Sequence, residues 1–235
     1  MESLVRDVMI AHLKRNKLLS NRRYGFIKGR SNALQPLKVL DTWTEIMDRG
    51  RELDVICLDF VKAFNPVPHK RLIGKLRSYD MSGKIVRWVT SFLLNRRQRV
   101  PVKGQFSAWT DVLRGIQQGS VLGPILFVLY INDLPDNMIS EVFVFADDTK
   151  VFREVRLNED IQTLQKDLNN LQGWSNKWLL RFHPDKCKVM TISRKKKRDQ
   201  KKYTTRKQVG NNTYTDHILD QVEKEKDLAV TVDKF

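Results

Sequence analysis

The sequence predicts an α+β fold, a sheet of buried strands backed by helices. Two apolar runs, 53–60 (LDVICLDF) and 142–146 (VFVFA), have the length and composition of strands. Short apolar runs of this kind are typical of strands that are buried on both faces. The segment 158–178 repeats apolar residues every three or four positions, as an amphipathic helix covering one face of a sheet does. Together the three segments favour the α+β class.

The remaining elements are predicted from local patterns along the chain. Helical spacing of apolar residues indicates further helices at 4–13, 34–49, 72–92 with a break near 81–83, and from Gly123 onward. Alternating residues and turn signals indicate a β-hairpin at 99–113 around Gly104, a strand at 187–192 and a closing strand at 227–233. A basic turn at 20–31 and a polar loop at 115–120 connect these elements.

The charge balance points to a polyanionic partner. The chain has 43 Lys and Arg residues against 27 Asp and Glu, a net charge of +16 over 235 residues. Such a surplus favours nucleic acid, although a solvated basic surface is the alternative. The basic run 194–207 fits a nucleic-acid patch or a nuclear-localisation signal, but we expect a solvated loop.

Nothing in the sequence indicates a membrane-bound or secreted protein. The longest apolar stretch, 121–134, is too short to cross a bilayer and is interrupted by Gly123 and Pro124. Two cysteines, Cys57 and Cys187, are too few for a disulfide framework and are expected as buried free thiols. We therefore expect an intracellular protein without a membrane partner, in the nucleus or the cytoplasm.

Acidic residues end both of the apolar strands. Asp59 closes the first strand, and we expect Asp147 and Asp148 to form the turn that follows the second. Three carboxylates that converge at strand ends would require a cation, and hard oxygen ligands favour Mg²⁺. Two such ions can catalyse an in-line phosphoryl displacement, which is the chemistry of nucleotidyl transfer. Taken singly, each acid has the simpler interpretation of a solvated turn residue.

Three motifs in order resemble the palm motifs of reverse transcriptases: 58–64 (LDFVKAF), 118–124 (QGSVLGP) and 145–148 (FADD). The surrounding sequence resembles the non-LTR (LINE-type) retrotransposon branch, in particular Jockey-like and chicken-repeat-like elements. Four further segments support the resemblance: 24–31 (YGFIKGRS), 176–179 (NKWL), 185–190 (DKCKVM) and 225–228 (EKDL). Several ordered motifs over nearly the whole chain make chance similarity an inadequate explanation.

The resemblance implies an RNA-directed DNA polymerase domain with the right-hand palm fold. Its antiparallel palm sheet would span 51–193, with a fingers-like insertion near 95–114. Residues 1–50 would be partial fingers, and 194–235 a basic loop and the closing hairpin of the palm. We expect a truncated or decayed copy that lacks a thumb. The implied partners are an RNA template, a DNA primer and deoxynucleoside triphosphates, with two Mg²⁺ ions, or Mn²⁺, as cofactor.

The resemblance also assigns roles to individual residues. Asp59, Asp147 and Asp148 match the metal-binding acids, and Phe64 matches the aromatic steric gate against ribonucleotides; its alternative is a core phenylalanine. The residues that match contacts to substrate are Gln118 and Gly119 below the nascent base pair, Lys28 and Arg30 at the incoming triphosphate, and Lys186 as a general acid toward pyrophosphate. The simpler alternatives are that Gly119 only forms the turn before a helix, and that Lys28 and Arg30 are loop charges in water.

Four positions depart from the family pattern without removing a metal ligand. They are Ile27 for Arg, Asn65 for Asp, Gln117 for Pro and Ala229 for Gly. The loss of an arginine at Ile27 would weaken triphosphate binding by about 1.5–3 kcal/mol, the value of a charged hydrogen bond. Two functions therefore stay open at this point: a catalytic polymerase domain, and a degenerate palm that only binds nucleic acid.

Overall fold

The computed structural model describes the chain except for residues 21–22, 25–33, 195–200, 211–212, 228–229 and 234–235. The chain forms two compact units from interleaved segments. The first unit comprises residues 1–21, 62–133 and 178–180, and the second unit comprises 22–61, 134–177 and 181–235.

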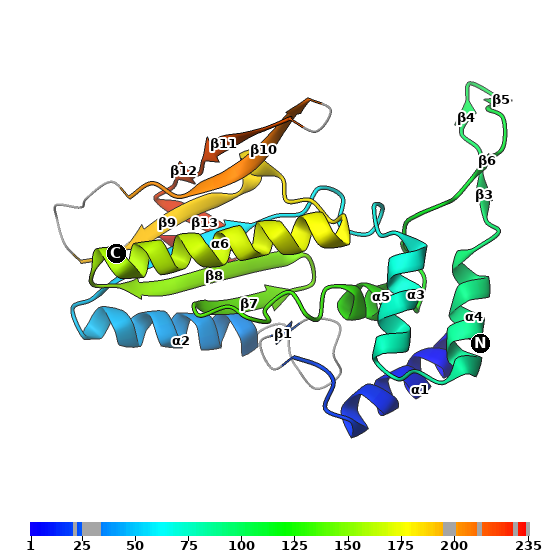
Figure 1. Cartoon of the computed structure of the whole chain (residues 1–235), viewed down its shortest axis with the longest axis horizontal. Helices are drawn as coiled ribbons and strands as arrows, with labels where there is room; N and C mark the ends of the chain where they lie inside the picture. Colours follow the sequence, from blue (N-terminus) through cyan, green and yellow to red (C-terminus); the bar gives the residue numbers. More distant parts are fainter. Residues whose placement is uncertain (21–22, 25–33, 195–200, 211–212, 228–229, 234–235) are drawn as a thin grey trace. The chain divides into compact units, whose positions relative to one another are not determined.

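The second unit is built on a six-stranded sheet with the strand order β1-β7-β8-β2-β9-β12 (Figure 1). The four central strands, β7, β8, β2 and β9, are antiparallel, and a short parallel strand is added at each edge. The strands are β1 (Arg23–Tyr24), β7 (Glu141–Phe145), β8 (Asp148–Val155), β2 (Glu52–Leu58), β9 (Lys188–Ile192) and β12 (Asp220–Gln221).

Two helices cover the sheet, one on each face. Helix α2 (Leu34–Asp48) buries Val39, Trp43 and Met47 against alternate residues of the central strands. Residues between those positions, such as Ile56 and Val151, are also buried and point to the opposite face. Helix α6 (Asn158–Trp178) runs along that face and buries its leucines there (Figure 1). The predicted α+β class is confirmed.

Strand β8 was not predicted, although it lies in the middle of the sheet. We expected Asp147 and Asp148 to form a turn, and the structure instead begins an eight-residue strand at Asp148. The strand carries polar residues such as Lys150 and Arg153 that hid its β character. Thr149, Val151 and Val155 are β-branched and alternate with other residues, and this was the signal available in the sequence.

The expected solvated loop at 194–207 is wrong for its C-terminal part. Residues 204–210 form strand β10, and Tyr203 is fully buried. The Tyr203 hydroxyl donates to Asp54 Oδ2 at 2.6 Å, and Lys201 pairs with Glu52 and Asp54. A buried carboxylate on the central strand thus fixes this basic segment, because an unpaired buried charge is costly.

Among the described residues of the second unit, the remaining elements are two hairpins and a short 3₁₀ helix. Strands β10 (Thr204–Gly210) and β11 (Thr213–Ile218) form one hairpin, and β13 (Lys224–Asp227) and β14 (Val230–Asp233) form the other. A single 3₁₀ turn, η1 (Pro184–Lys186), precedes β9.

The first unit is helical and carries one β-hairpin. Its helices are α1 (Glu2–Arg15), α3 (His69–Ser78), α4 (Gly83–Leu93) and α5 (Gly123–Tyr130), in agreement with the predicted segments. Seven of the eight residues of α5 are buried, as its uniformly apolar sequence requires. In the hairpin, β3 (Arg97–Gln98) pairs with β6 (Thr110–Asp111), and β4 (Pro101–Val102) pairs with β5 (Gln105–Phe106).

Within the described residues, no helix combines the length and the apolar character needed to cross a bilayer.

The buried Tyr203–Asp54 hydrogen bond predicts a measurable loss of stability in Tyr203→Phe. The substitution removes one hydrogen bond to a buried carboxylate, which is worth about 2 kcal/mol. Tyr214→Phe is the matched control, since Tyr214 is 41% exposed on β11. Denaturant unfolding should show a lower free energy of unfolding for Tyr203→Phe and a value equal to the wild type for Tyr214→Phe. Equal values for both variants would contradict the role given to Asp54.

Candidate active site

The antiparallel register of β2 and β8 brings the predicted acids to adjacent strand ends. Leu58 of β2 pairs with Thr149 of β8. Asp59 directly follows Leu58, and Asp148 directly precedes Thr149, so the two acids lie at adjacent strand ends. Partners across antiparallel strands point to the same face, and successive residues point to opposite faces. Phe60 contacts Trp174 of α6 at 6.3 Å between ring centroids. Asp59 and Asp148 therefore both belong to the other face, which α2 covers further along the strands.

The turn that carries Asp147 has an unusual backbone. Because Phe145 pairs with Asp148, only Ala146 and Asp147 connect β7 with β8. Ala146 is buried and has φ +52°, a conformation in which two-residue hairpins usually place glycine. A non-glycine residue there costs about 1–2 kcal/mol. The strained turn presents Asp147 half-exposed beside Asp148.

A lysine neutralises the first acid. Lys186 Nζ lies 3.0 Å from Asp59 Oδ2, and the side chains are 59% and 35% exposed. Exposed ion pairs of this kind contribute at most about 1 kcal/mol, so a divalent cation can displace the lysine at little cost. Burial raises the pKa of the adjacent Cys187 thiol to about 11, which keeps the thiol neutral at pH 7. Cys187 is buried as expected, whereas Cys57 is only half-buried.

The three acids do not form an assembled metal site. Among the described residues, no three Asp, Glu, His or Cys side chains are close enough to hold one ion. The donor set is nevertheless chemically suited to Mg²⁺, because all three groups are carboxylates at the ends of paired strands. The ammonium of Lys186 stands where a cation is needed.

Phe64 lies in the first unit, in a turn that precedes α3. Its ring is half-buried and stacks on Phe127 of α5, with 4.6 Å between centroids. Phe64 therefore packs as a core phenylalanine, which was its simpler interpretation. Selection against ribonucleotides stays a prediction.

Gln118 and Gly119 form a turn in the first unit, ahead of α5. Gly119 has φ +78°, and a Cβ added there would have no neighbour within 4 Å. The backbone conformation alone thus accounts for this glycine. The Gln118 amide lies 3.4 Å from Asn65 Oδ1, a weak contact with one of the positions that depart from the family pattern.

A cluster around Gly115 fixes the segment that leads to Gln118. Gly115 has φ +95°, and a Cβ would lie 2.9 Å from the Asn65 carbonyl oxygen. The Gly115 carbonyl accepts hydrogen bonds from His69 Nε2 at 2.9 Å and from Arg96 at 3.0 Å. Burial lowers the pKa of His69, so a neutral imidazole donates this bond. No sequence pattern indicates this role of His69, because only the fold brings it to Gly115, 46 positions along the chain.

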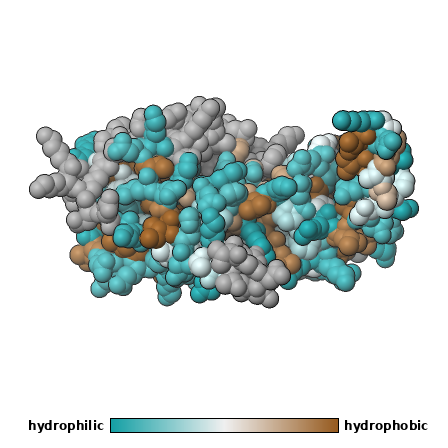
Figure 2. Space-filling view, turned by 90° about the horizontal axis from the view of Figure 1, so that it is seen from above, coloured by the Kyte–Doolittle hydropathy of each residue, from teal (hydrophilic) through white to brown (hydrophobic). Residues whose placement is uncertain are grey.

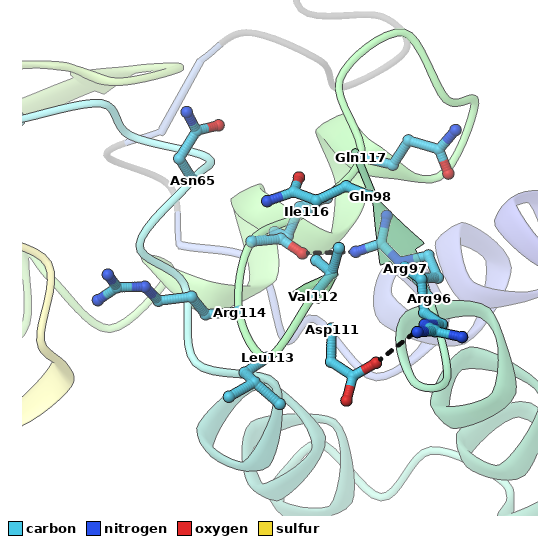
Figure 3. Close-up of a pocket in the computed structure, with 11 residues that line it drawn as sticks. Asn65, Arg96, Arg97, Gln98, Asp111, Val112, Leu113, Arg114, Ile116 and Gln117 are labelled. Carbon is cyan, nitrogen blue, oxygen red and sulfur yellow. Dashed lines mark hydrogen bonds and ion pairs between the residues drawn. The ribbon is translucent and has the colours of Figure 1, made fainter. Parts of the chain in front are cut away.

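A basic pocket of about 740 Å³ opens beside this cluster in the first unit. It is lined by the base of the hairpin and by the segment that follows it. Arg97 and Asp111 form an ion pair across the hairpin base, and Arg96 reaches the Gly115 carbonyl (Figure 3).

Comparison with known proteins supports the arrangement of motifs. Residues 3–224 match the family model described as reverse transcriptase (RNA-dependent DNA polymerase). The chain belongs to the reverse transcriptase family.

The relatives of this reverse transcriptase domain come from non-LTR retrotransposons, as the motifs predicted. It is 26% identical to the probable RNA-directed DNA polymerase from transposon BS of Drosophila melanogaster, over 99% of this chain and 26% of that protein. It is 27% identical to the polymerase from mobile element jockey of the same fly, over 82% of this chain and 22% of that protein. The chain thus spans about a quarter of these curated relatives.

Solved telomerase structures share the fold of the reverse transcriptase domain. Apo telomerase from Candida tropicalis, truncated from its C-terminal domain, matches with a TM-score of 0.62 at 13% identity, covering 99% of this chain and 45% of that chain. A telomerase from Candida albicans, in complex with a TWJ fragment of telomeric RNA, matches with a TM-score of 0.60 at 12% identity over 84% of this chain and 36% of that chain.

Some predicted positions of the reverse transcriptase motifs lie outside the described residues. These are Lys28 and Arg30, together with the departures Ile27 and Ala229. Within the described residues, Asp59, Asp147, Asp148 and Lys186 belong to the second unit.

The Gly115 cluster predicts that Gly115→Ala is far more damaging than Gly104→Ala. Both glycines have positive φ, but a Cβ at Gly104 would have no neighbour within 4 Å. Gly104→Ala should cost about 1 kcal/mol of unfolding free energy, and Gly115→Ala about 3 kcal/mol, because the Asn65 backbone must also move. Thermal and denaturant unfolding measure both values. Similar losses in the two variants would argue against the close packing of Gly115 on Asn65.

Proposed function

We propose that this domain adds deoxynucleotides to the 3′-hydroxyl of a DNA primer, as directed by an RNA template. One observation carries the proposal: in a chain of the reverse transcriptase family, the pairing of β2 with β8 sets Asp59 beside the strained turn of Asp147 and Asp148. Strain at a short turn is commonly retained where it positions a functional side chain.

Asp59, Asp147 and Asp148 are proposed to hold divalent metal, two Mg²⁺ ions or Mn²⁺ in their place. When bound, the metal would activate the primer hydroxyl and neutralise charge on the triphosphate. Binding would release the Lys186 ammonium from Asp59, with which it forms an exposed ion pair. Lys186 could then donate a proton to the pyrophosphate that leaves, which is general acid catalysis.

The other motif residues are proposed to position substrate. Gln118 and Gly119 would lie beneath the nascent base pair, and Lys28 and Arg30 would bind the incoming triphosphate. The net charge of +16 supports a template and primer as partners, since each phosphate contact releases counterions. We retain the assignment of 1–50 as partial fingers, 51–193 as palm and 194–235 as basic loop and closing hairpin as a proposal.

A second candidate function is nucleic-acid binding without turnover. It is favoured by the absence, among the described residues, of three assembled ligands, and by the pairing of Asp59 with a lysine. Both candidates predict binding that weakens with salt. Only the catalytic one predicts metal-dependent synthesis.

Primer extension with Asp147→Asn separates the two candidates. On poly(A) with oligo(dT) and Mg²⁺, the wild-type chain should extend the primer. Asp147→Asn should lower the rate about 100-fold or more, because each 1.4 kcal/mol of lost transition-state stabilisation costs a factor of ten. Glu141→Gln, an exposed acid at the other end of β7, is the matched control. Wild-type extension no greater than that of Asp147→Asn would leave binding as the function.

Phe64→Val tests the selection of deoxynucleotides. A smaller side chain should admit ribonucleotides, raising their incorporation relative to deoxynucleotides by about tenfold or more, since a steric clash of at least 1.4 kcal/mol is removed. Phe92→Val is the control, because Phe92 is a half-buried aromatic residue that stacks on Trp88 in the same unit. Competition assays with both sugar types measure the ratio. A ratio unchanged in Phe64→Val would limit Phe64 to its packing on Phe127.

A further inference from the structure

The hairpin of the first unit, residues 97–111, has no core of its own. Every residue from 97 to 111 is exposed, including large apolar side chains. Their exposed fractions are 51–61%: Val100, Val102, Phe106 and Trp109. Apolar surface is visible over the hairpin at the right of the view in Figure 2. A gathered exposed apolar surface is a usual sign of a binding partner.

Arginine and aromatic side chains are stacked on this hairpin. The Arg99 guanidinium carbon lies 3.8 Å from the Phe106 ring centroid and 4.7 Å from that of Trp109. Arg97 lies 5.9 Å from the Trp109 centroid. Guanidinium planes and aromatic rings are the surfaces on which unpaired nucleobases stack, and each base so stacked contributes binding energy independent of sequence.

The charge of the segment favours a polyanion over a protein. Residues 96–114 contain five Lys and Arg residues and a single acid, Asp111. That acid pairs with Arg97 at 3.5 Å, with both side chains more than half exposed. An exposed pair of this kind contributes little, so a phosphate can replace the carboxylate as the partner of Arg97.

The basic pocket lies directly at the base of the hairpin. Arg96, Arg97 and Arg114 are among its lining residues, and Figure 3 shows Arg114 on the opposite side from the other two. Arg96 already donates a hydrogen bond to the Gly115 carbonyl. Of the three arginines that line the pocket, Arg97 and Arg114 can therefore bind a sugar–phosphate backbone.

We infer that the hairpin and its basal pocket bind an unpaired nucleic-acid strand. A base stacks on the surface made by Arg99, Phe106 and Trp109, and the adjoining phosphates meet Arg97 and Arg114. The inference rests on the proposed function, because it specifies how the template or primer is held. Single strands should bind in preference to a blunt duplex, whose bases have no free face for stacking.

Fluorescence anisotropy with the full 235-residue chain tests the inference. The probes are labelled dT₁₂, rU₁₂ and a blunt duplex of equal length. Trp109→Ala and Phe106→Ala should each raise the Kd for single strands about fivefold or more, the effect of losing one stacked base. Arg114→Ala should also reduce the slope of log Kd against log salt by about 0.7, because one phosphate-neutralising cation is lost.

Val100→Ala and Val102→Ala are the matched controls, as exposed as the aromatic residues and on the same hairpin. They should bind single strands like the wild type. Equal losses in the valine variants, or wild-type affinity in Trp109→Ala, would overturn the inference. Since all substituted residues are exposed, circular dichroism should show each variant folded.

The two proposals fail separately in this design. Asp147→Asn should keep single-strand affinity that depends on Trp109, even though it does not extend primers. A wild-type chain that binds in this way without extension supports the hairpin site and overturns catalysis. A chain that extends primers while Trp109→Ala and Phe106→Ala bind single strands normally overturns the hairpin site alone.

Discussion

Strand β2 pairs along its whole length with β8, from Glu52 with Val155 to Leu58 with Thr149. This register decides on which face each residue points, and a slip by one position would turn Asp148 toward the face covered by α6. The apolar packing on both faces holds the register, since Val55 and Phe152 contact α2 while Ile56 and Val151 are buried on the other side. The candidate active site is thus a consequence of core packing.

The local electrostatics follow from that arrangement. Three carboxylates at neighbouring strand ends repel one another unless a cation is present. Lys186 supplies a cation at Asp59 through an exposed pair that is easily exchanged. A more buried pair, such as Lys201 with Asp54, instead fixes the chain permanently, because breaking it would leave an unpaired charge in the core. Exposure therefore distinguishes a replaceable cation from a structural one.

In the first unit, the segment 97–115 is anchored at Gly115, whereas its residues 97–111 are all exposed. Gly115 is held by His69, Arg96 and the backbone of Asn65, so the chain is fixed where it leaves the hairpin. The hairpin itself then needs few contacts with a core. Its aromatic and arginine side chains stay on the surface, where they are open to a ligand.

Local patterns in the sequence were sufficient to predict most helices and strands. The apolar run at 53–60 predicted β2, the run at 142–146 predicted β7, and the helical repeat at 158–178 predicted α6. The ordered motifs around Asp59, Gln118 and Asp147 identified the family, which the match over 3–224 confirmed. The roles of the individual acids stay predictions.

Only the tertiary structure decided which distant residues meet. Strand β8 was not predicted because the polar residues Lys150 and Arg153 interrupt its apolar pattern, and its pairing with β7 on one side and β2 on the other is a tertiary contact. The burial of Tyr203 on Asp54 and of His69 on Gly115 joins residues 149 and 46 positions apart. By itself the sequence determined the periodic elements and the motifs, because these depend on neighbours along the chain. Contacts across the chain depend on how whole elements pack, and no local pattern records them.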